Sequence, residues 1–513
     1  MGALHRTPVR LGLLGLGSLV VVGSVLWSQR AESGRAAGAP PSPRGIVLVC
    51  VDTLRADGMS LPDERDGPMP RLQAFACDAT VFAHATASSA WTAPSITSLL
   101  TGLRPSQHGV EAFGRASPLA LSVPTLAEAL HAGGWSTGAI TGGGWVSPEQ
   151  GLARGFDTFA TTFDELGPEA ALFAWDRARP KDRPFFLFLH TYAAHDPYGQ
   201  RAWMRGGTSR LHAAATLAPA ALAAGLERGG GRLPEDLLTP FVLQHLTNPL
   251  GRLACAQAIG APRYDDLWRD AMPWIDGGYA ASGDASVVQA AVRASYRAGL
   301  GSADEVVHEA FTSLARLGLL DRADVIVTSD HGESFGEHRT LAHGLHLYDD
   351  VLRVPLLIRA RGRMPAPRRV REACGGTDVA PTILDLAGLV VPPGLDGRSL
   401  VGLAGRASEG RTVVAELERG AHPKHPMEGR VRLVAVRSAA WKWILRFDPA
   451  DGRVLGEELY DLAQDPQERA ALPMQDGLPP GVGDEFCRAV AAERNRVRRL
   501  AGLEAVQAAC LPN

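Results

Sequence analysis

Residues 91–102 read Trp91-Thr92-Ala93-Pro94-Ser95-Ile96-Thr97-Ser98-Leu99-Leu100-Thr101-Gly102. Pro94 and the small hydroxyl residues around it predict a turn, and Leu99-Leu100 predict the opening of a buried helix. A hydroxyl just before such a helix lies where free backbone N–H groups and the positive end of the helix dipole gather. The stretch therefore predicts a site for an anionic group near Thr92.

Three apolar runs elsewhere predict buried strands of a parallel sheet. They occupy residues 45–51, 184–189 and 324–328. The polar residues at or just beyond their carboxyl ends are Asp52, His190, His195, Asp330 and His331. Because ligands of open α/β sheets bind outside the carboxyl ends of the strands, these side chains are candidates for one site.

Each candidate also has a structural interpretation. An Asp at a strand end, such as Asp52, can cap a helix instead, and a single His at such a place is more often structural than functional. Imidazole can, however, ligate a metal or donate a proton to a leaving oxygen. Asp330 and His331 can both face one metal only if the backbone turns sharply, and Gly332 permits that turn.

The central stretch resembles the signature of the sulfatase family, a branch of the alkaline phosphatase superfamily, which reads Cys/Ser-x-Pro-Ser-Arg-x-x-Leu-Leu-Thr-Gly. The matching residues are Pro94, Ser95, Leu99, Leu100, Thr101 and Gly102. Two positions differ: Thr92 stands at the Cys or Ser nucleophile, and Ile96 stands at the Arg.

Other segments are similar to motifs of the same family. They are residues 51–57, 190–198, 330–337, 348–358 and 458–466. The resemblance implies that one divalent cation is bound by Asp52, Thr92, Asp330 and His331. It also implies His195 or His343 as proton donor to the leaving group, His343 standing where many members carry a Lys. His190 and His346 are expected to bind substrate.

The resemblance implies an α/β fold: a three-layer α/β/α sandwich with a mainly parallel, alkaline-phosphatase-like sheet, and a smaller C-terminal subdomain with an antiparallel sheet. We expect a catalytic domain at residues 44–400 and the subdomain at 401–513. Residues 200–290 match no motif of the family. We interpret them as a variable helical insertion that either selects the substrate or only packs against the domain.

The N-terminus has the form of an export signal. In residues 1–30, His5, Arg6 and Arg10 precede an uncharged run from Leu11 to Trp27, and an Ala/Gly/Pro/Ser-rich linker follows at 31–43. The run is short for a membrane span, but no clear cleavage site follows it, so an uncleaved membrane anchor is favoured over a cleaved signal peptide. We therefore expect an exported protein, periplasmic or at the cell surface, in which Cys487 and Cys510 could form a disulfide.

The composition excludes a general electrostatic attraction to nucleic acid. Lys and Arg number 52 against 55 Asp and Glu, a net charge of -3. We expect instead a sulfated or phosphorylated small molecule, glycan or lipid head group as the substrate. Oxygen ligands with one imidazole favour Mn²⁺ or Zn²⁺, with Ca²⁺ as the alternative.

Thr92 decides the predicted chemistry. Sulfatases of the family oxidise their Cys or Ser to formylglycine, whose sulfated hydrate expels sulfate by returning to the aldehyde. Oxidation of Thr could give only a ketone. A sulfated Thr92 therefore could not release sulfate by this route, whereas a phosphorylated Thr92 can be attacked by water at phosphorus. The sequence therefore predicts a metal-dependent hydrolase of sulfuric or phosphoric esters, with phosphoesters favoured.

Two alternatives stay open. One is a membrane-anchored transferase of phospho-head-groups, which is disfavoured because the chain has a single hydrophobic segment. The other is a catalytically silent glycan-binding protein with the same fold, which is disfavoured by the intact metal ligands Asp52, Asp330 and His331.

Overall fold

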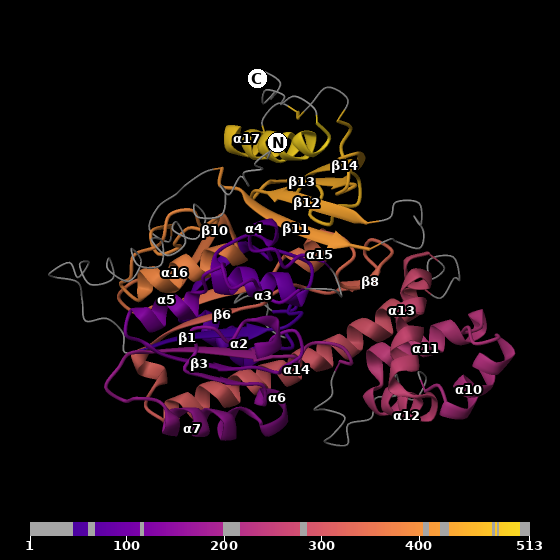
Figure 1. The fold of residues 1–513 in the computed structure, drawn as a ribbon, viewed down its shortest axis with the longest axis horizontal. Coiled ribbons are helices and arrows are strands. Elements are labelled where there is room, and N and C mark those ends of the chain that lie inside the picture. The colour runs from indigo at the N-terminus through magenta and orange to yellow at the C-terminus, as the bar shows by residue number, and fades with distance from the viewer. Residues whose placement is uncertain are drawn as a thin grey trace, which may run out of the picture.

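The computed structural model describes residues 45–59, 67–112, 117–198, 216–277, 285–403, 410–420, 430–474, 478–479 and 482–502, with only the backbone described at 272–277 and 285–287. In Figure 1 a main sheet lies between two helical layers, a second sheet covers one of these layers, and a group of helices projects from one side.

The main sheet is mixed but mainly parallel, as the sequence predicts. Its strand order is β10-β2-β9-β6-β1-β5-β3-β4, and β9 runs antiparallel to its neighbours β2 and β6. The strands are β1 (Gly45–Val51), β2 (Thr80–Thr86), β3 (Ser136–Ile140), β4 (Thr158–Ala160), β5 (Phe185–Thr191), β6 (Ala323–Thr328), β9 (Leu356–Arg359) and β10 (Arg368–Gly375).

Helices cover both faces of this sheet, which explains why its central strands are apolar throughout. Along β1, Ile46, Leu48 and Cys50 pack into one core, and Val47, Val49 and Val51 pack into the other. The first core contains α3 (Thr92–Thr101), α5 (Leu126–Ala132), α15 (Asp349–Leu352) and α16 (Val379–Leu386). The second contains α2 (Pro70–Ala76), α6 (Phe163–Leu166), α7 (Pro168–Ala178) and α14 (Ala285–Arg316). The predicted three layers are thereby confirmed.

The segment that matched no motif is helical where it is described. It forms α10 (Pro219–Arg228), α11 (Glu235–Thr247), α12 (Pro249–Ile259) and α13 (Ala261–Gly277). These helices stand to one side of the main sheet, and the long α14 connects them to it (Figure 1). Side chains such as Phe241 and Tyr264 pack into the same core as α14.

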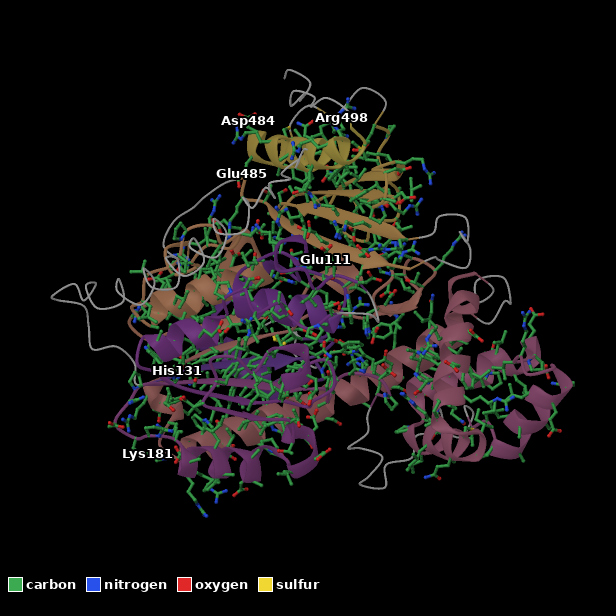
Figure 2. The ribbon with its side chains drawn as sticks, viewed as in Figure 1. Glu111, His131, Lys181, Asp484, Glu485 and Arg498 are labelled. Atoms are coloured by element: carbon green, nitrogen blue, oxygen red, sulfur yellow. The ribbon has the colours of Figure 1, made fainter. Side chains whose placement is uncertain are left out.

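The C-terminal sheet is antiparallel in the order β11-β12-β13-β14, as expected. Its strands are β11 (Val413–Arg419), β12 (Val431–Arg437), β13 (Trp441–Phe447) and β14 (Val454–Asp461). Helix α17 (Asp484–Leu500) packs on its outer face through Phe486 and Val490. Figure 2 shows Asp484 and Glu485 at one end of α17 and Arg498 at the other, the charge arrangement that a helix dipole favours.

The short connections near the site are the helix α4 (Pro105–His108) and the small ribbon of β7 (Ser334–Phe335) and β8 (Leu341–Ala342). Across the described ranges, we find no helix with both the length and the apolar content that a bilayer span requires. The predicted export signal and linker lie outside the described residues. Cys487 is disulfide-bonded, while Cys510 also lies outside the described residues, so this pairing stays a prediction.

Candidate active site

The register of the central strands brings the predicted site residues to one edge of the sheet. Cys50 in β1 pairs with His190 in β5 on one side and with Thr328 in β6 on the other, all in parallel. Asp52 therefore lies beside His190, and Asp330 and His331 follow β6 at the same edge.

Thr92 reaches this edge from the first turn of α3. Its Oγ1 atom lies 3.3 Å from Oδ2 of Asp52 and 3.3 Å from Nε2 of His331, and all three side chains are buried. Because Thr92 is the first residue of the ten-residue helix, its hydroxyl lies near the free N–H groups of that turn. The prediction of a hydroxyl at a helix N-terminus is confirmed. The predicted turn around Pro94 is wrong, because the helix begins at Thr92 and not near Leu99, and proline is tolerated in the first turn of a helix.

The backbone after β1 is held in an uncommon conformation. Thr53 has a φ of 59°, a region that non-glycine residues rarely adopt and that is frequent at functional sites. The Tyr296 hydroxyl of α14 donates to the Thr53 carbonyl at 2.8 Å, and the Thr53 amide donates to Oδ1 of Asp330 at 3.4 Å. The first contact ties the loop after β1 to α14, and the second ties it to the loop that carries Asp330.

The donor set fits a divalent cation. Ligand atoms of Asp52, Asp330 and His331 all lie within 4.8 Å of one another, and the buried atoms Asp52 Oδ1 and Asp330 Oδ2 have no hydrogen-bond partner among the described residues. Buried carboxylate oxygens without partners are costly, so such a pair fits a bound cation. The Nδ1 atom of His331 contacts the Gly332 carbonyl at 2.8 Å, which leaves Nε2 facing the carboxylates.

The electrostatics of this group agree with metal binding. Burial and the neighbouring Asp52 raise the pKa of Asp330 well above its usual value. Burial also acts to raise the pKa of Asp52, but a hydrogen bond from His190 and the nearby imidazoles outweigh it, so the pKa of Asp52 is lowered. Burial, helped by His343, lowers the pKa of His331 to about 3, so this ring is neutral and able to ligate a metal.

The two predicted proton donors lie beside this group. The ring centroids of His331 and His343 are 4.4 Å apart, and those of His343 and His195 are 5.2 Å apart. The Nδ1 atom of His343 contacts Oε1 of Glu333 at 3.0 Å, and the Tyr198 hydroxyl donates to Oε2 of the same carboxylate at 2.9 Å. His195 and His343 thus form one cluster with His331.

The two predicted substrate-binding histidines lie in different surroundings. His190 is fully buried, and its Nε2 atom contacts Oδ2 of Asp52 at 3.3 Å, a contact that suits holding this carboxylate in place. His346 contacts Thr340 at 2.7 Å and packs against Tyr348. None of its described contacts reaches the metal-binding group, so its substrate role stays a prediction.

Several residues near the site were assigned no role from the sequence. They are Tyr192, Asp196, Tyr198, Tyr296 and Glu333. Glu333 and Tyr198 stand inside motifs that the sequence does show, and Asp196 directly follows His195, so these three carried a local signal. Tyr296 lies in the middle of the long helix α14 and carried none.

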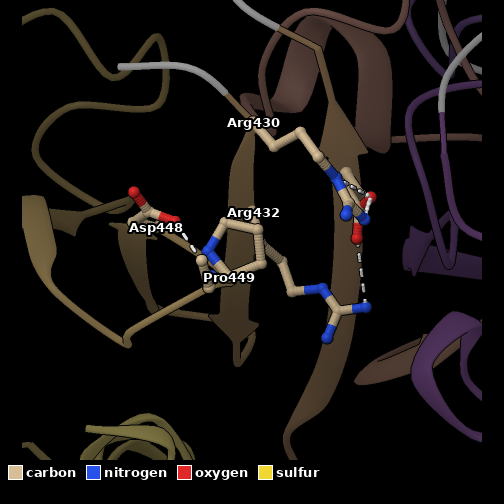
Figure 3. A pocket seen from close by; sticks show the side chains of 6 residues that line it. Arg430, Arg432, Asp448 and Pro449 are labelled. Atoms are coloured by element: carbon tan, nitrogen blue, oxygen red, sulfur yellow. Dashed lines mark hydrogen bonds and ion pairs between the residues drawn. The ribbon is translucent and has the colours of Figure 1, made fainter. Parts of the chain in front are cut away.

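A separate cavity of about 440 Å³ lies in the C-terminal subdomain (Figure 3). It is lined by Glu418, Arg430, Arg432, Asp448, Pro449 and Ala450. Both arginines form ion pairs with Glu418, and Arg432 also pairs with Glu111. Its charges are therefore compensated within the protein, and we do not assign the active site to it.

The structure is therefore that of an α/β protein whose mainly parallel sheet has, at the ends of its strands, a buried group that could hold a metal ion. The chain belongs to the sulfatase family: the family model "Sulfatase" matches residues 44–166 and 164–389. A second model, "N-sulphoglucosamine sulphohydrolase, C-terminal", matches residues 336–478.

The matches to individual proteins either cover only part of the chain or have low sequence identity. Arylsulfatase K of Mus musculus is 32% identical over 186 residues, which span 34% of this chain and only 32% of that protein. A solved structure of a protein in complex with its substrate D-glucosamine-2-N,6-O-disulfate has a TM-score of 0.60 at 19% identity, over 90% of this chain and 98% of that one. The phosphonate monoester hydrolase of Agrobacterium radiobacter has a TM-score of 0.59 at 21% identity, over 89% of this chain and 95% of that one. These structures show the shared fold.

Proposed function

We propose that this chain is a metal-dependent hydrolase of sulfuric or phosphoric esters that prefers phosphoesters and uses Thr92 as its nucleophile. One observation carries the proposal: the buried Thr92 hydroxyl lies 3.3 Å from both Asp52 and His331, inside the group that fits a cation. A hydroxyl whose neighbours are metal ligands is placed to become an activated nucleophile.

The preference for phosphoesters rests on the side chain at this position. Thr92 stands where the family signature has the formylglycine precursor, and its Cβ methyl prevents formation of an aldehyde. A sulfate ester on an unmodified Thr92 could not be released by the return to an aldehyde that formylglycine allows. The fold itself is compatible with either ester, since its structural relatives include a protein with a sulfated sugar as its substrate and a phosphonate monoester hydrolase.

Asp52, Asp330 and His331 would hold the cation, with Thr92 as a further ligand. Mn²⁺ or Zn²⁺ suits this set best, with Ca²⁺ as the alternative. The bound cation supplies Lewis acidity that lowers the pKa of the Thr92 hydroxyl and offsets charge on the ester oxygens.

The protein's own groups carry out two displacements. In the first, Oγ1 of Thr92 loses its proton to solvent and bonds to phosphorus as the bond to the leaving oxygen breaks, and His195 or His343 gives that oxygen a proton. In the second, water attacks phosphorus and releases a proton to solvent as the bond to Oγ1 breaks. Oγ1 and the histidine then each take a proton from solvent, which restores the Thr92 hydroxyl and the proton donor. The net reaction consumes one ester and one water and yields one acid and one alcohol.

We also propose that the reaction takes place outside the cytoplasm. An export signal or anchor in residues 1–30 would place the enzyme outside the cytoplasm, in the periplasm or at the cell surface. There it would meet a phosphorylated or sulfated small molecule, glycan or lipid head group.

The test is turnover of nitrophenyl sulfate, nitrophenyl phosphate and bis-nitrophenyl phosphate by the full chain with Mn²⁺, Zn²⁺ or Ca²⁺. We expect turnover of phosphoesters, a loss of at least about 10³-fold in Thr92→Ala, and partial activity in Thr92→Ser. Thr97→Ala is the matched control, because Thr97 lies in the same helix and its hydroxyl bonds only its own turn, at the Ala93 carbonyl. Turnover of the sulfate ester alone would overturn the phosphoester preference, and no turnover with any metal would favour the glycan-binding alternative.

A further inference from the structure

The helical insertion contacts the active-site histidine through one carboxylate. Asp196 directly follows His195, and its Oδ1 atom lies 2.9 Å from Nδ1 of His195. Its other oxygen, Oδ2, lies 3.2 Å from Nη1 of Arg252 in α12 and 3.4 Å from Nε2 of His245 in α11. Groups from two insertion helices therefore hold the carboxylate that holds His195.

The surroundings of His245 keep its imidazole ring neutral and place its N–H toward Asp196. Its ring stacks on Trp268 of α13, with centroids 3.6 Å apart and an interplanar angle of 7°. Burial lowers the pKa of His245 to about 4, although the hydrogen bond with Asp196 acts in the opposite direction. The Nδ1 atom has no hydrogen-bond partner among the described residues, so the single proton of the neutral ring belongs on Nε2, toward Asp196.

His195 in turn has the properties of a proton donor. Burial acts to lower its pKa, but Asp196, followed by Asp52 and Glu333, outweighs this and raises the pKa of His195 well above its usual value. Its Nδ1 atom is engaged by the carboxylate and the carbonyl oxygen of Asp196. The protonated ring therefore has its Nε2–H available, and its edge contacts are with His343 and Tyr192 beside the metal-binding group.

We propose that the insertion is part of the catalytic apparatus: His245 and Arg252 are positioning residues that lock Asp196, and through it orient His195 to protonate the leaving oxygen. This inference rests on the proposed ester hydrolysis and extends it to the class of substrate. A fixed proton donor matters most when the leaving group is a poor one, so the natural substrate is an ester of an aliphatic alcohol rather than of an acidic phenol.

The test compares two leaving groups on the metal-loaded full chain. Phosphodiesters that release nitrophenol or an aliphatic alcohol are assayed with wild type, His245→Phe and Arg252→Gln. Nitrophenolate leaves without a proton, so we expect its kcat to change less than about 3-fold, while kcat for the aliphatic ester falls about 10- to 100-fold with little change in KM. His245→Gln keeps a neutral N–H donor and should restore most of the loss.

The matched control is Arg269→Gln, because Arg269 lies on α13 of the same insertion and pairs with Asp266 at the surface. It should affect neither ester. Equal losses for both esters in His245→Phe or Arg252→Gln would show a merely structural role, and unchanged kinetics would show no role. Either result overturns the inference.

A second measurement separates this inference from the proposed function. The titration of His195 is followed by nuclear magnetic resonance of histidine-labelled full chain, with His195→Gln identifying its signal. Loss of the Arg252 charge would by itself raise the pKa of His195, so a lower pKa in Arg252→Gln reports loss of the Asp196 contact. If no ester is turned over, the proposed function fails, while an unchanged or raised pKa of His195 in Arg252→Gln overturns the positioning role.

Discussion

The Nε2 atom of His190 and the Oγ1 atom of Thr92 both lie 3.3 Å from the same oxygen of Asp52, Oδ2. The other oxygen, Oδ1, has no hydrogen-bond partner among the described residues. His190 is fully buried in β5, the strand next to β1, and Asp52 directly follows β1. The two oxygens of this carboxylate therefore have different tasks: Oδ2 fixes its orientation, and Oδ1 is left for a cation.

Removing the His190 ring should weaken metal binding without removing a ligand. We expect His190→Ala to raise the Kd for Mn²⁺ about 10- to 100-fold, the usual effect of losing a group that orients a metal ligand. Isothermal titration calorimetry of the full chain measures this. His190→Asn, which keeps a donor, should lose less, and His131→Ala at the exposed end of α5 serves as the control. An unchanged Kd in His190→Ala would contradict the orienting role.

A fully buried lysine, Lys442 of β13, links the C-terminal sheet to helix α15. Its Nζ atom lies 2.9 Å from Asp349 of α15 and 2.7 Å from Glu468. Lys442→Met would leave the buried Glu468 carboxylate without its cation and Asp349 with Arg437 alone, and we expect it to lower the free energy of unfolding by about 3–5 kcal/mol. Urea unfolding at pH 7 measures the change.

The matched control for this lysine is Lys181→Met. Lys181 lies on the far side of the molecule from the C-terminal subdomain (Figure 2), and its side chain is 54% exposed beside Asp176. An exposed pair of this kind contributes less than about 1 kcal/mol. Equal effects of the two substitutions would show that the buried cluster is not a major source of stability.

Asp324 in β6 should make stability depend on pH. Burial raises the pKa of Asp324 to about 7, although Arg363 and Arg359 act against it, and Oδ2 has no hydrogen-bond partner among the described residues. The folded state therefore binds this proton more tightly than the unfolded state does. The contribution of Asp324 to stability falls as the pH rises from about 4 to 7 and is constant above that range.

Asp324→Asn removes this titration while keeping the shape of the side chain. We expect the free energy of unfolding of Asp324→Asn to exceed that of wild type by roughly 2–3 kcal/mol more at pH 8 than at pH 5. Urea midpoints of both proteins at the two pH values measure the difference. A gain that is the same at both pH values would show that Asp324 is ionised in the folded protein across this range.

The sequence predicted the central part of the fold and site because the signals there are local. Continuous apolar runs followed by Asp52 and by Asp330-His331 indicate buried parallel strands and the edge at which they end. The antiparallel direction of β9 was not predicted, since an apolar run reads the same in both directions. The helical character of the insertion was predicted, with substrate selection and a packing role as the alternatives, but its contact with His195 through Asp196 was not.

Contacts between distant segments explain most of what the sequence could not show. His245 and Arg252 lie about fifty residues from Asp196 along the chain, and only the packing of α11 and α12 brings them to it. His343 and His346 are three residues apart, and the sequence assigned both to the site. Positive φ angles at Ala342 and Gly344 turn this loop sharply, so that His343 faces His331 while His346 contacts Thr340.

Mass spectrometry of the peptide that contains Thr92 can show whether Thr92 bonds covalently to phosphorus during turnover. The metal-loaded full chain is mixed with bis-nitrophenyl phosphate and quenched in acid within one turnover. We predict a nitrophenyl phosphate adduct on an otherwise unmodified Thr92, and no adduct in Thr92→Ala. Turnover with no adduct on Thr92 at any quench time, or with the adduct on another residue, would show that Thr92 is not the nucleophile.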